Sequence, residues 1–286
     1  MDRESGLSLP EDNNPYGAPP PGNPAPTSRN PYAAPSAKVD QSAPPPDIGE
    51  LVEGGQRVAT GRGLAWLTEG FGLFMQAPGM WIGITFIFIL LTMAMAAVPF
   101  IGSLALNLLM PVFTAGLLLG CRALDQGEPL TIDFLFAGFK ENVGQLVMVG
   151  LLYMVGVTVL VIVALLIGGV AALGMIAAGS NFDRPGPALV GAIAIFFLLV
   201  IALIVPLAMA IWYAPALVVF HKQEPMAAMR QSLSGCMKNM LPFLLYGLLL
   251  VVPSLFATLP VLLGWLVLWP VMVGGLYVSY KDIYCA

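Results

Sequence analysis

The stretch LAWLTEGFGLFMQAPGMWIG, residues Leu64 to Gly83, changes character in its middle. Up to Gln76 the apolar residues recur at helical spacing and polar residues fill the gaps, which is typical of an amphipathic helix. From Trp81 to Cys121 the chain carries no charged side chain. Pro78 and Gly79 stand at the change and permit a bend between two helices. We therefore expect a helix in the membrane interface that runs directly into a helix crossing the bilayer.

The composition of the whole chain points the same way. The 286 residues are 58% hydrophobic and only 10% charged, whereas a typical soluble domain is about 45–50% apolar and about 25% charged. Sixteen acidic and twelve basic residues are too few to cover the surface of so apolar a globule. The composition therefore predicts an all-α integral membrane protein.

Residues 1–57 have a different composition from the rest. They hold 12 of the 25 prolines, and their eight acids and four bases account for the whole net charge of −4. Segments of this kind bury too little apolar surface to offset the entropy of ordering. We expect a disordered, Pro-rich cytoplasmic tail over residues 1–57, followed by a membrane domain over residues 58–286. The tail lacks the apolar run of a signal peptide, and its acidity argues against nucleic acid as a partner.

The motif NPYGAP (Asn14 to Pro19) recurs in the tail as NPYAAP (Asn30 to Pro35). Two interpretations remain open. The repeated motif is a low-complexity spacer, or it is a docking site for a cytoplasmic partner with an aromatic-lined groove.

Four long runs without charge follow the tail, and each is longer than the ~20 residues that one crossing needs. The runs are Trp81–Cys121, Val143–Gly179, Ala188–Phe220 and Asn239–Tyr280. The first and last runs suit two crossings each, with turns near Val98–Ser103 and Thr258–Pro260. The two middle runs are single crossings that must tilt, project beyond the bilayer or break, at Gly168-Gly169 or at Pro206 and Pro215. The total is six transmembrane helices in three hairpins.

The basic residues indicate the orientation. With six spans both termini share one side, and that side carries eleven of the twelve Lys and Arg residues, whereas Arg184 alone lies on the other. This bias places both termini in the cytoplasm. Cys121, Cys236 and Cys285 then fall at the cytoplasmic edge, where thiols stay reduced, so we expect no disulfide.

The apolar positions of the opening helix recur twice along the chain. When Leu64 is matched to Met226, the residues Leu64, Leu67, Phe71, Phe74, Met75 and Pro78 correspond to Met226, Met229, Leu233, Cys236, Met237 and Met240. When Leu64 is matched to Pro129, the same positions give Pro129, Ile132, Phe136, Phe139, Lys140 and Val143. The pattern suggests three repeats, about 61–124, 126–179 and 223–280, each an amphipathic interfacial helix followed by a hairpin. Coincidence among helices that share an environment is the alternative.

The second predicted span contains two kinds of face. Gly116 and Gly120 form the Gly-x-x-x-Gly pattern that lets helices approach closely, and Asn107 lies on the opposite side. We expect this span near the centre of the bundle. Because an unpaired amide in lipid is costly, Asn107 should find a partner, either in a structural hydrogen bond or in a bound solute.

The sequence offers no catalytic, cofactor-binding or metal-binding residues. His221 is the single histidine, and we interpret it as an interfacial anchor or a bonded polar group. Glu69 and Glu141 are most simply charges on the wet faces of amphipathic segments. A lipid-modifying enzyme would need two of these three residues within reach of one pocket, and the predicted spans themselves contain no charged side chain.

Several stretches resemble a known family. GRGLAWLTEGFGLFMQAPGMWIG, LMPVFTAGLLLGCRALDQGEPL, LFAGFKENVGQLVMVGLLY and YAPALVVFHKQEPMAAMRQSLSGCMKNMLPFLLYG together resemble an uncharacterised family of proteobacterial multi-span inner-membrane proteins, whose members often carry an NPYxAP tail. The resemblance covers roughly residues 57–284. It implies an inner-membrane location and assigns no activity.

We expect a non-enzymatic integral membrane component that acts as a scaffold or binds a partner. Its partners would be the lipid bilayer, other membrane proteins and a cytoplasmic protein for the tail. The alternative is a transporter or channel-like protein for a neutral or lipid-like solute, which requires a cavity near Asn107.

Overall fold

The structure is a computed structural model of the chain, and it describes residues 48–177, 186–259 and 263–286. Every regular element named in these ranges is a helix. In chain order the helices are α1 (Arg62–Gln76), α2 (Pro78–Ala96), α3 (Ile101–Asp125), α4 (Phe134–Ala137), α5 (Val143–Ala177), α6 (Pro187–Trp212), α7 (Ala214–His221), α8 (Pro225–Lys238), α9 (Met240–Thr258) and α10 (Trp265–Tyr284). The all-helical prediction is therefore confirmed for the described residues.

The bend predicted in the opening stretch is present. Helix α1 ends at Gln76 and α2 begins at Pro78, so that Ala77 alone joins them, with φ −147° and ψ 58°. Proline lacks a backbone N–H and fits the first turn of a helix. The buried indole of Trp81 donates a 3.2 Å hydrogen bond to the carbonyl of Leu73 across the bend. This bond fixes the angle between the two helices.

Helix α1 is apolar on two sides. Trp66, Leu73 and Phe74 are buried, and α1 packs mainly on α10. Leu64 and Met75 belong to the face predicted from the spacing, and they are 50% and 55% exposed. One side therefore holds α1 in the protein, and the other is free to meet lipid.

We expected an amphipathic helix before the second hairpin, and this expectation is wrong. Residues 129–143 contain only the one-turn α4. Tight turns lie on both sides of α4. After it, for example, Phe139 N and Lys140 N donate to the carbonyls three residues earlier. Gly138 lies so close to α3 that a Cβ there would come 2.0 Å from the carbonyl oxygen of Val112. The segment follows the surface of α3, and a regular helix does not form.

Five described segments are long and apolar enough to cross a membrane: α2, α3, α5 to Gly174, α6 with α7 from Val190, and α9. The sixth predicted span corresponds to α10, which is not among the five. The last turn of α10 carries Lys281 and Asp282, which lowers its mean hydropathy.

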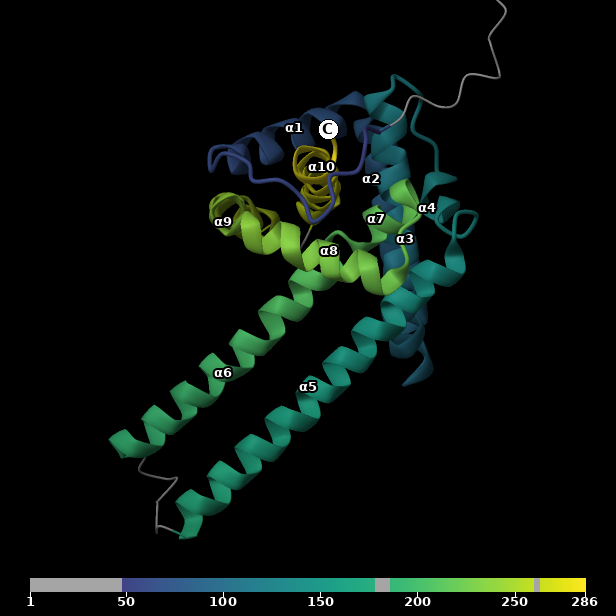
Figure 1. Ribbon diagram of the computed structural model, residues 1–286. Coiled ribbons are helices and arrows are strands. Elements are labelled where there is room, and N and C mark those ends of the chain that lie inside the picture. The colour runs from purple at the N-terminus through teal and green to yellow at the C-terminus, as the bar shows by residue number, and fades with distance from the viewer. Residues whose placement is uncertain (1–47, 178–185, 260–262) are drawn as a thin grey trace, which may run out of the picture. The chain divides into compact units, whose positions relative to one another are not determined.

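The two over-long runs behave differently from each other. Helix α5 continues through Gly168-Gly169 without a break, which leaves tilting or projecting beyond the bilayer as the alternatives for this run. Its 35 residues extend about 52 Å at 1.5 Å per residue. Helix α6 contains Pro206 inside it and ends at Trp212, and Pro215 starts α7 as expected for a helix end. Figure 1 shows α5 and α6 as neighbouring long helices, and they contact each other.

Helix α3 is the most buried of the five candidate spans. Half of its most apolar window is buried, compared with 22% or less in the other four. On its glycine side, a Cβ at Gly116 would lie 2.4 Å from the carbonyl oxygen of Phe134. The prediction that this span lies near the centre of the packing is confirmed.

The residues Ile48–Val58, here called the strap, are ordered along the end of α10. Val52 N donates to Tyr284 O and Gln56 N donates to Ile283 O, both at 2.8 Å. An isolated antiparallel bridge also joins Leu51 and Cys285. The expected disordered tail over residues 1–57 is therefore too long at its C-terminal end, because these backbone groups have partners. The rest of that tail, residues 1–47, lies outside the described residues.

The strap is also tied to the junction of α8 and α9. Asn239 is 1% exposed; its Oδ1 accepts a hydrogen bond from Val58 N, and its Nδ2 donates to the carbonyls of Gln56 and Gly235. Lys238 Nζ donates to the backbone oxygens of Gly54 and Gly55. Every side-chain polar atom of Asn239 is thus satisfied, as burial requires.

Candidate functional site

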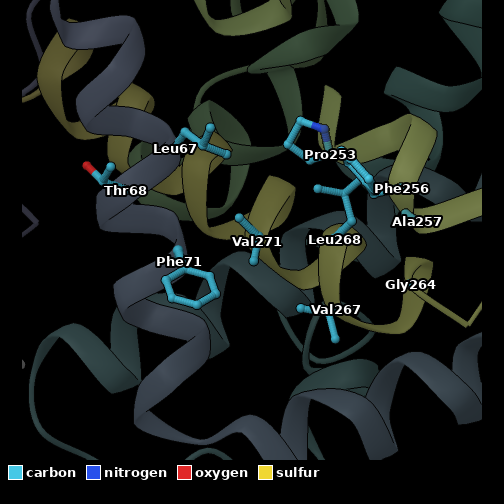
Figure 2. Close-up of a pocket in the computed structure, with 10 residues that line it drawn as sticks. All are labelled: Leu67, Thr68, Phe71, Pro253, Phe256, Ala257, Gly264, Val267, Leu268 and Val271. Atoms are coloured by element: carbon cyan, nitrogen blue, oxygen red, sulfur yellow. The ribbon is translucent and has the colours of Figure 1, made fainter. Parts of the chain in front are cut away.

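An apolar pocket lies between α1, α9 and α10, and Figure 2 shows the side chains that line it. Its volume is about 530 Å³. The lining residues are Leu67, Thr68, Phe71, Pro253, Phe256, Ala257, Gly264, Val267, Leu268 and Val271. Ligand pockets in proteins usually measure about 300–1,000 Å³, so the space is large enough for a ligand of moderate size.

The pocket has a buried wall and an open mouth. Leu268 and Val271 of α10 are 6% and 3% exposed and form the wall. Phe71 of α1 and Phe256 of α9 are 48% and 67% exposed, so large apolar side chains rim the opening. Because α9 is a candidate membrane span, the exposed Phe256 at this mouth belongs to a helix that is expected to contact hydrocarbon.

The polar capacity of the pocket is already used within the chain. Thr68 is the single lining residue with a polar side chain, and its Oγ1 bonds to the carbonyls of Leu64 and Ala65 in its own helix. No lining side chain carries a charge or a titratable group. The pocket can therefore bind through apolar contact, and it offers no group for acid–base chemistry.

A polar cavity of about 430 Å³ lies on a different face of α1. It is lined by Glu69, Gly72, Leu73, Gln76, Asp125, Tyr277, Val278, Lys281 and Asp282. At about 100° per residue, the α1 residues of this cavity point well away from Leu67, Thr68 and Phe71. Helix α1 thus separates the apolar pocket from the polar cavity.

The charges of the polar cavity are paired with one another. Arg62 donates from two nitrogens to both carboxylate oxygens of Asp282, at 2.6 and 2.8 Å, and Trp66 Nε1 donates to the same carboxylate at 2.7 Å. Hydrogen bonding to Asp282 raises the pKa of the Arg62 guanidinium. Lys281 Nζ lies 2.6 Å from Asp125, so neighbouring residues of α10 are tied to α1 and to α3. This arrangement locks three helices together.

Sequence reasoning did not assign a role to Asp282, Lys281 or Asp125. These residues lie just outside the uncharged runs, and their partners are 156 to 220 residues away. The available signal was the adjacent pair of opposite charges that directly follows a span, since such a pair can bond to two different neighbours.

Asn107 lies on the exposed side of α3. Its Nδ2 donates to the carbonyl of Ser103 at 2.8 Å, one turn earlier in the same helix. The expected partner is therefore its own backbone. The apolar pocket described above lies between other helices, so a solute site at Asn107 has no support.

His221 bonds on both sides of its ring. Its Nδ1 is 2.5 Å from the hydroxyl of Tyr280, and its Nε2 is 3.2 Å from the carbonyl of Gly49. It connects α7, α10 and the strap, which agrees with its interpretation as a bonded polar group.

The structure places Glu69 and Glu141 at different sites. Glu69 pairs with Arg62 at 3.0 Å beside α10. Glu141 lines a second polar cavity of about 310 Å³ between α3 and the α4 segment. Among the described residues, no three His, Cys, Asp or Glu side chains are arranged to hold a metal ion, and Cys121, Cys236 and Cys285 are not joined in a disulfide.

The chain is similar to a probable inner membrane protein of Burkholderia thailandensis. The two are 29% identical over 197 residues, which cover 67% of this chain and 73% of the relative. No protein-family model matches the chain. No solved structure matches it either. The similarity confirms the resemblance to uncharacterised bacterial inner-membrane proteins that the sequence motifs indicate.

Proposed function

We propose that this chain is a non-enzymatic, multi-span inner-membrane protein that binds the acyl chain of a membrane lipid in the pocket between α1, α9 and α10. The observation that carries the proposal is the chemistry of this pocket. It is large enough for a ligand, its mouth is rimmed by exposed Phe71 and Phe256, and its lining carries no charge.

The proposed topology is six spans in three hairpins with both termini in the cytoplasm. Five segments meet the length and hydropathy of a span, and α10 is the sixth, shielded from lipid on one side by α1. The basic residues support the orientation, because the connections inside the three proposed hairpins contain a single Lys or Arg, which is Arg184. The relative from Burkholderia thailandensis supports the inner-membrane location.

A photoactivatable phospholipid with the reactive group near the end of one acyl chain tests the proposed binding. We expect cross-links in purified protein to map to peptides of α1 and α9–α10. In Val267→Trp the indole fills the pocket, and we expect at least a several-fold loss of these cross-links.

Leu248→Trp is the matched control, because Leu248 lies on the same hairpin and is 67% exposed away from the pocket. It should label as the parent does. Equal labelling of all three proteins would show that the pocket is not the lipid site.

Transport of a lipid-like solute is the second candidate function. It is favoured by the lateral position of the apolar mouth, and its earlier basis at Asn107 is lost because that amide is exposed and bonded within its own helix. Fluorescent phospholipid in proteoliposomes should change leaflet faster with protein than without it. An unchanged rate eliminates transport and leaves lipid binding intact.

The cytoplasmic tail is proposed to hold a soluble partner of the membrane domain. The repeated NPYxAP motifs support this role. Affinity purification with and without residues 1–47 tests it, and an identical set of co-purified proteins would remove the tail from the function.

A further inference from the structure

The three segments that precede the predicted hairpins dock in the same way. The α4 segment packs on α3, the last helix of the hairpin before it. Helix α8 packs on α6 and α7, which end the next hairpin. Helix α1 is the first helix of the described residues, and it packs on α10, the last one.

Helices α1 and α8 bury the same register. With Leu64 matched to Met226, the buried pairs are Trp66 and Ala228, Gly70 and Ser232, Leu73 and Gly235, and Phe74 and Cys236. The exposed pairs are Leu64 and Met226, and Met75 and Met237. A single residue joins each of them to the next helix, Ala77 after α1 and Asn239 after α8. The two helices therefore bury the same face.

Each of the three seams brings backbones close together. A Cβ at Gly70 would lie 2.5 Å from Gly275 N in the α1–α10 seam, and one at Gly116 would lie 2.4 Å from Phe134 O in the α3–α4 seam. In the α6–α8 seam, Ser232 Oγ donates to Met209 O at 2.6 Å and accepts from Tyr213 N. Small residues at each crossing permit this approach.

A polar cavity recurs beside two of the seams. Glu69, Gly72 and Gln76 line the cavity next to the α1–α10 seam. The positions that correspond to them in the second repeat, with Leu64 matched to Pro129, are Phe134, Ala137 and Glu141, and these line the cavity next to the α3–α4 seam. The one-turn α4 segment therefore occupies the same place in its unit as α1, although its helix is shorter.

We propose that the three units form a closed ring, in which the α1–α10 contact is a third seam of the same kind as the two between consecutive units. This rests on the three-hairpin arrangement of the proposed function. In such a ring the three junctions between units are equivalent. The chain can therefore begin and end at any of them, and its ends can be moved to another seam.

The strap and the residues after α10 already meet as two strands of a hairpin without its turn. Leu51 pairs antiparallel with Cys285, and Ala286 N donates to Glu50 O at 3.1 Å. One asparagine inserted between Ala286 and Gly49 would form an Asn-Gly turn of two residues, the preferred connection for such a pair. Gly49 has φ +112°, so a glycine suits its backbone conformation.

The test is a circular permutant in the order 1–48, 128–286, Asn, 49–127. Its new break falls at Gly127 and Glu128, in the exposed loop between α3 and α4. The parent and the permutant both carry Gly120→Cys and Leu130→Cys. The two positions are close, because a Cβ added to Gly120 would lie 2.8 Å from Leu130 Cδ1. In the permutant this disulfide joins residues that are no longer neighbours in the chain.

We expect the permutant to form the disulfide to the same extent as the parent and to unfold within about 5 °C of it. A control permutant opened between Pro99 and Phe100, inside a hairpin, should be degraded, because its new ends fall on the wrong side of the membrane. If the first permutant is degraded like this control or lacks the disulfide, the closed ring is wrong. Lipid cross-linking to the natural chain is unaffected by that result, so the two proposals fail separately.

Discussion

Asn239 and Val58 are 181 residues apart in the sequence and joined by a 2.8 Å hydrogen bond in the structure. The bond is one of three made by this buried amide: those to Val58 and Gln56 hold the strap against the start of α9, and the third goes to Gly235 in α8. The segment that leads into the membrane domain is therefore fixed at the same junction at which α8 becomes α9.

Replacing Asn239 tests how firmly the strap is held. Asn239→Ala removes three hydrogen bonds and leaves buried backbone groups unpaired, so we expect a loss of about 3 kcal/mol in the free energy of unfolding. Trypsin should cut after Arg57 sooner, because the strap is released. Ser234→Ala removes one bond, to Gly54 O, and should cost about 1 kcal/mol. Equal cleavage rates for the two variants would contradict this role of Asn239.

The α1–α10 seam should tolerate no side chain at Gly70. Gly70→Leu places atoms against the backbone of Gly275 and Val271, and we expect it to cost about 3 kcal/mol through overpacking. Gly72→Leu is the control on the same helix, since nothing lies within 4 Å of its added Cβ. It should be neutral or stabilising by under about 1 kcal/mol. Thermal unfolding in detergent distinguishes the two, and similar midpoints would count against a tight seam.

The two acidic partners of Arg62 should differ in importance. Asp282 is the less exposed of the two and accepts three hydrogen bonds from Arg62 and Trp66. We expect Asp282→Asn to lower stability by about 2 kcal/mol, the range of hydrogen bonds to charged groups. Glu69→Gln should cost under about 0.5 kcal/mol, as is usual for exposed ion pairs. Denaturant titration of both variants measures the difference, and a larger effect at Glu69 would reverse the assignment.

The thiol of Cys236 should be unreactive at neutral pH. Burial in α8 raises its pKa to about 12, and the thiolate is the reactive form. A raised pKa keeps the thiol protonated below about pH 12, so maleimide labelling of native protein should stay slow from pH 7 to pH 9. Unfolding in SDS should make it react at the ordinary rate. Rapid labelling of native protein at pH 7, identified by peptide mass, would show that the site is open.

The features that the sequence predicts best are those set by nearby residues. The bend at Ala77 follows from Pro78, the turn before Ile101 lies in the stretch Val98–Ser103 in which the sequence predicts it, and the end of α6 follows from Pro215. Each depends on backbone restrictions that act within a few residues. At Gly168-Gly169, where a break is one of three predicted alternatives, the helix continues, because two glycines weaken a helix without ending it.

The features that the sequence does not reveal depend on distant partners. The short α4 results from contact with Val112 and Gly116, and the ordered strap results from bonds to Asn239 and to the end of α10. The apolar pocket likewise needs residues from α1, α9 and α10 at once. Composition and periodicity carry no information on such pairings, whereas they sufficed to predict apolar helices that span a membrane.

The contact between the first and last helices sets an order of events during synthesis. Arg62 emerges from the ribosome 220 residues before its partner Asp282. At the usual ~5–20 residues per second, α1 waits on the order of 10 to 40 s with its glycine face uncovered. The insertion machinery or the lipid surface must shelter that face until α10 emerges.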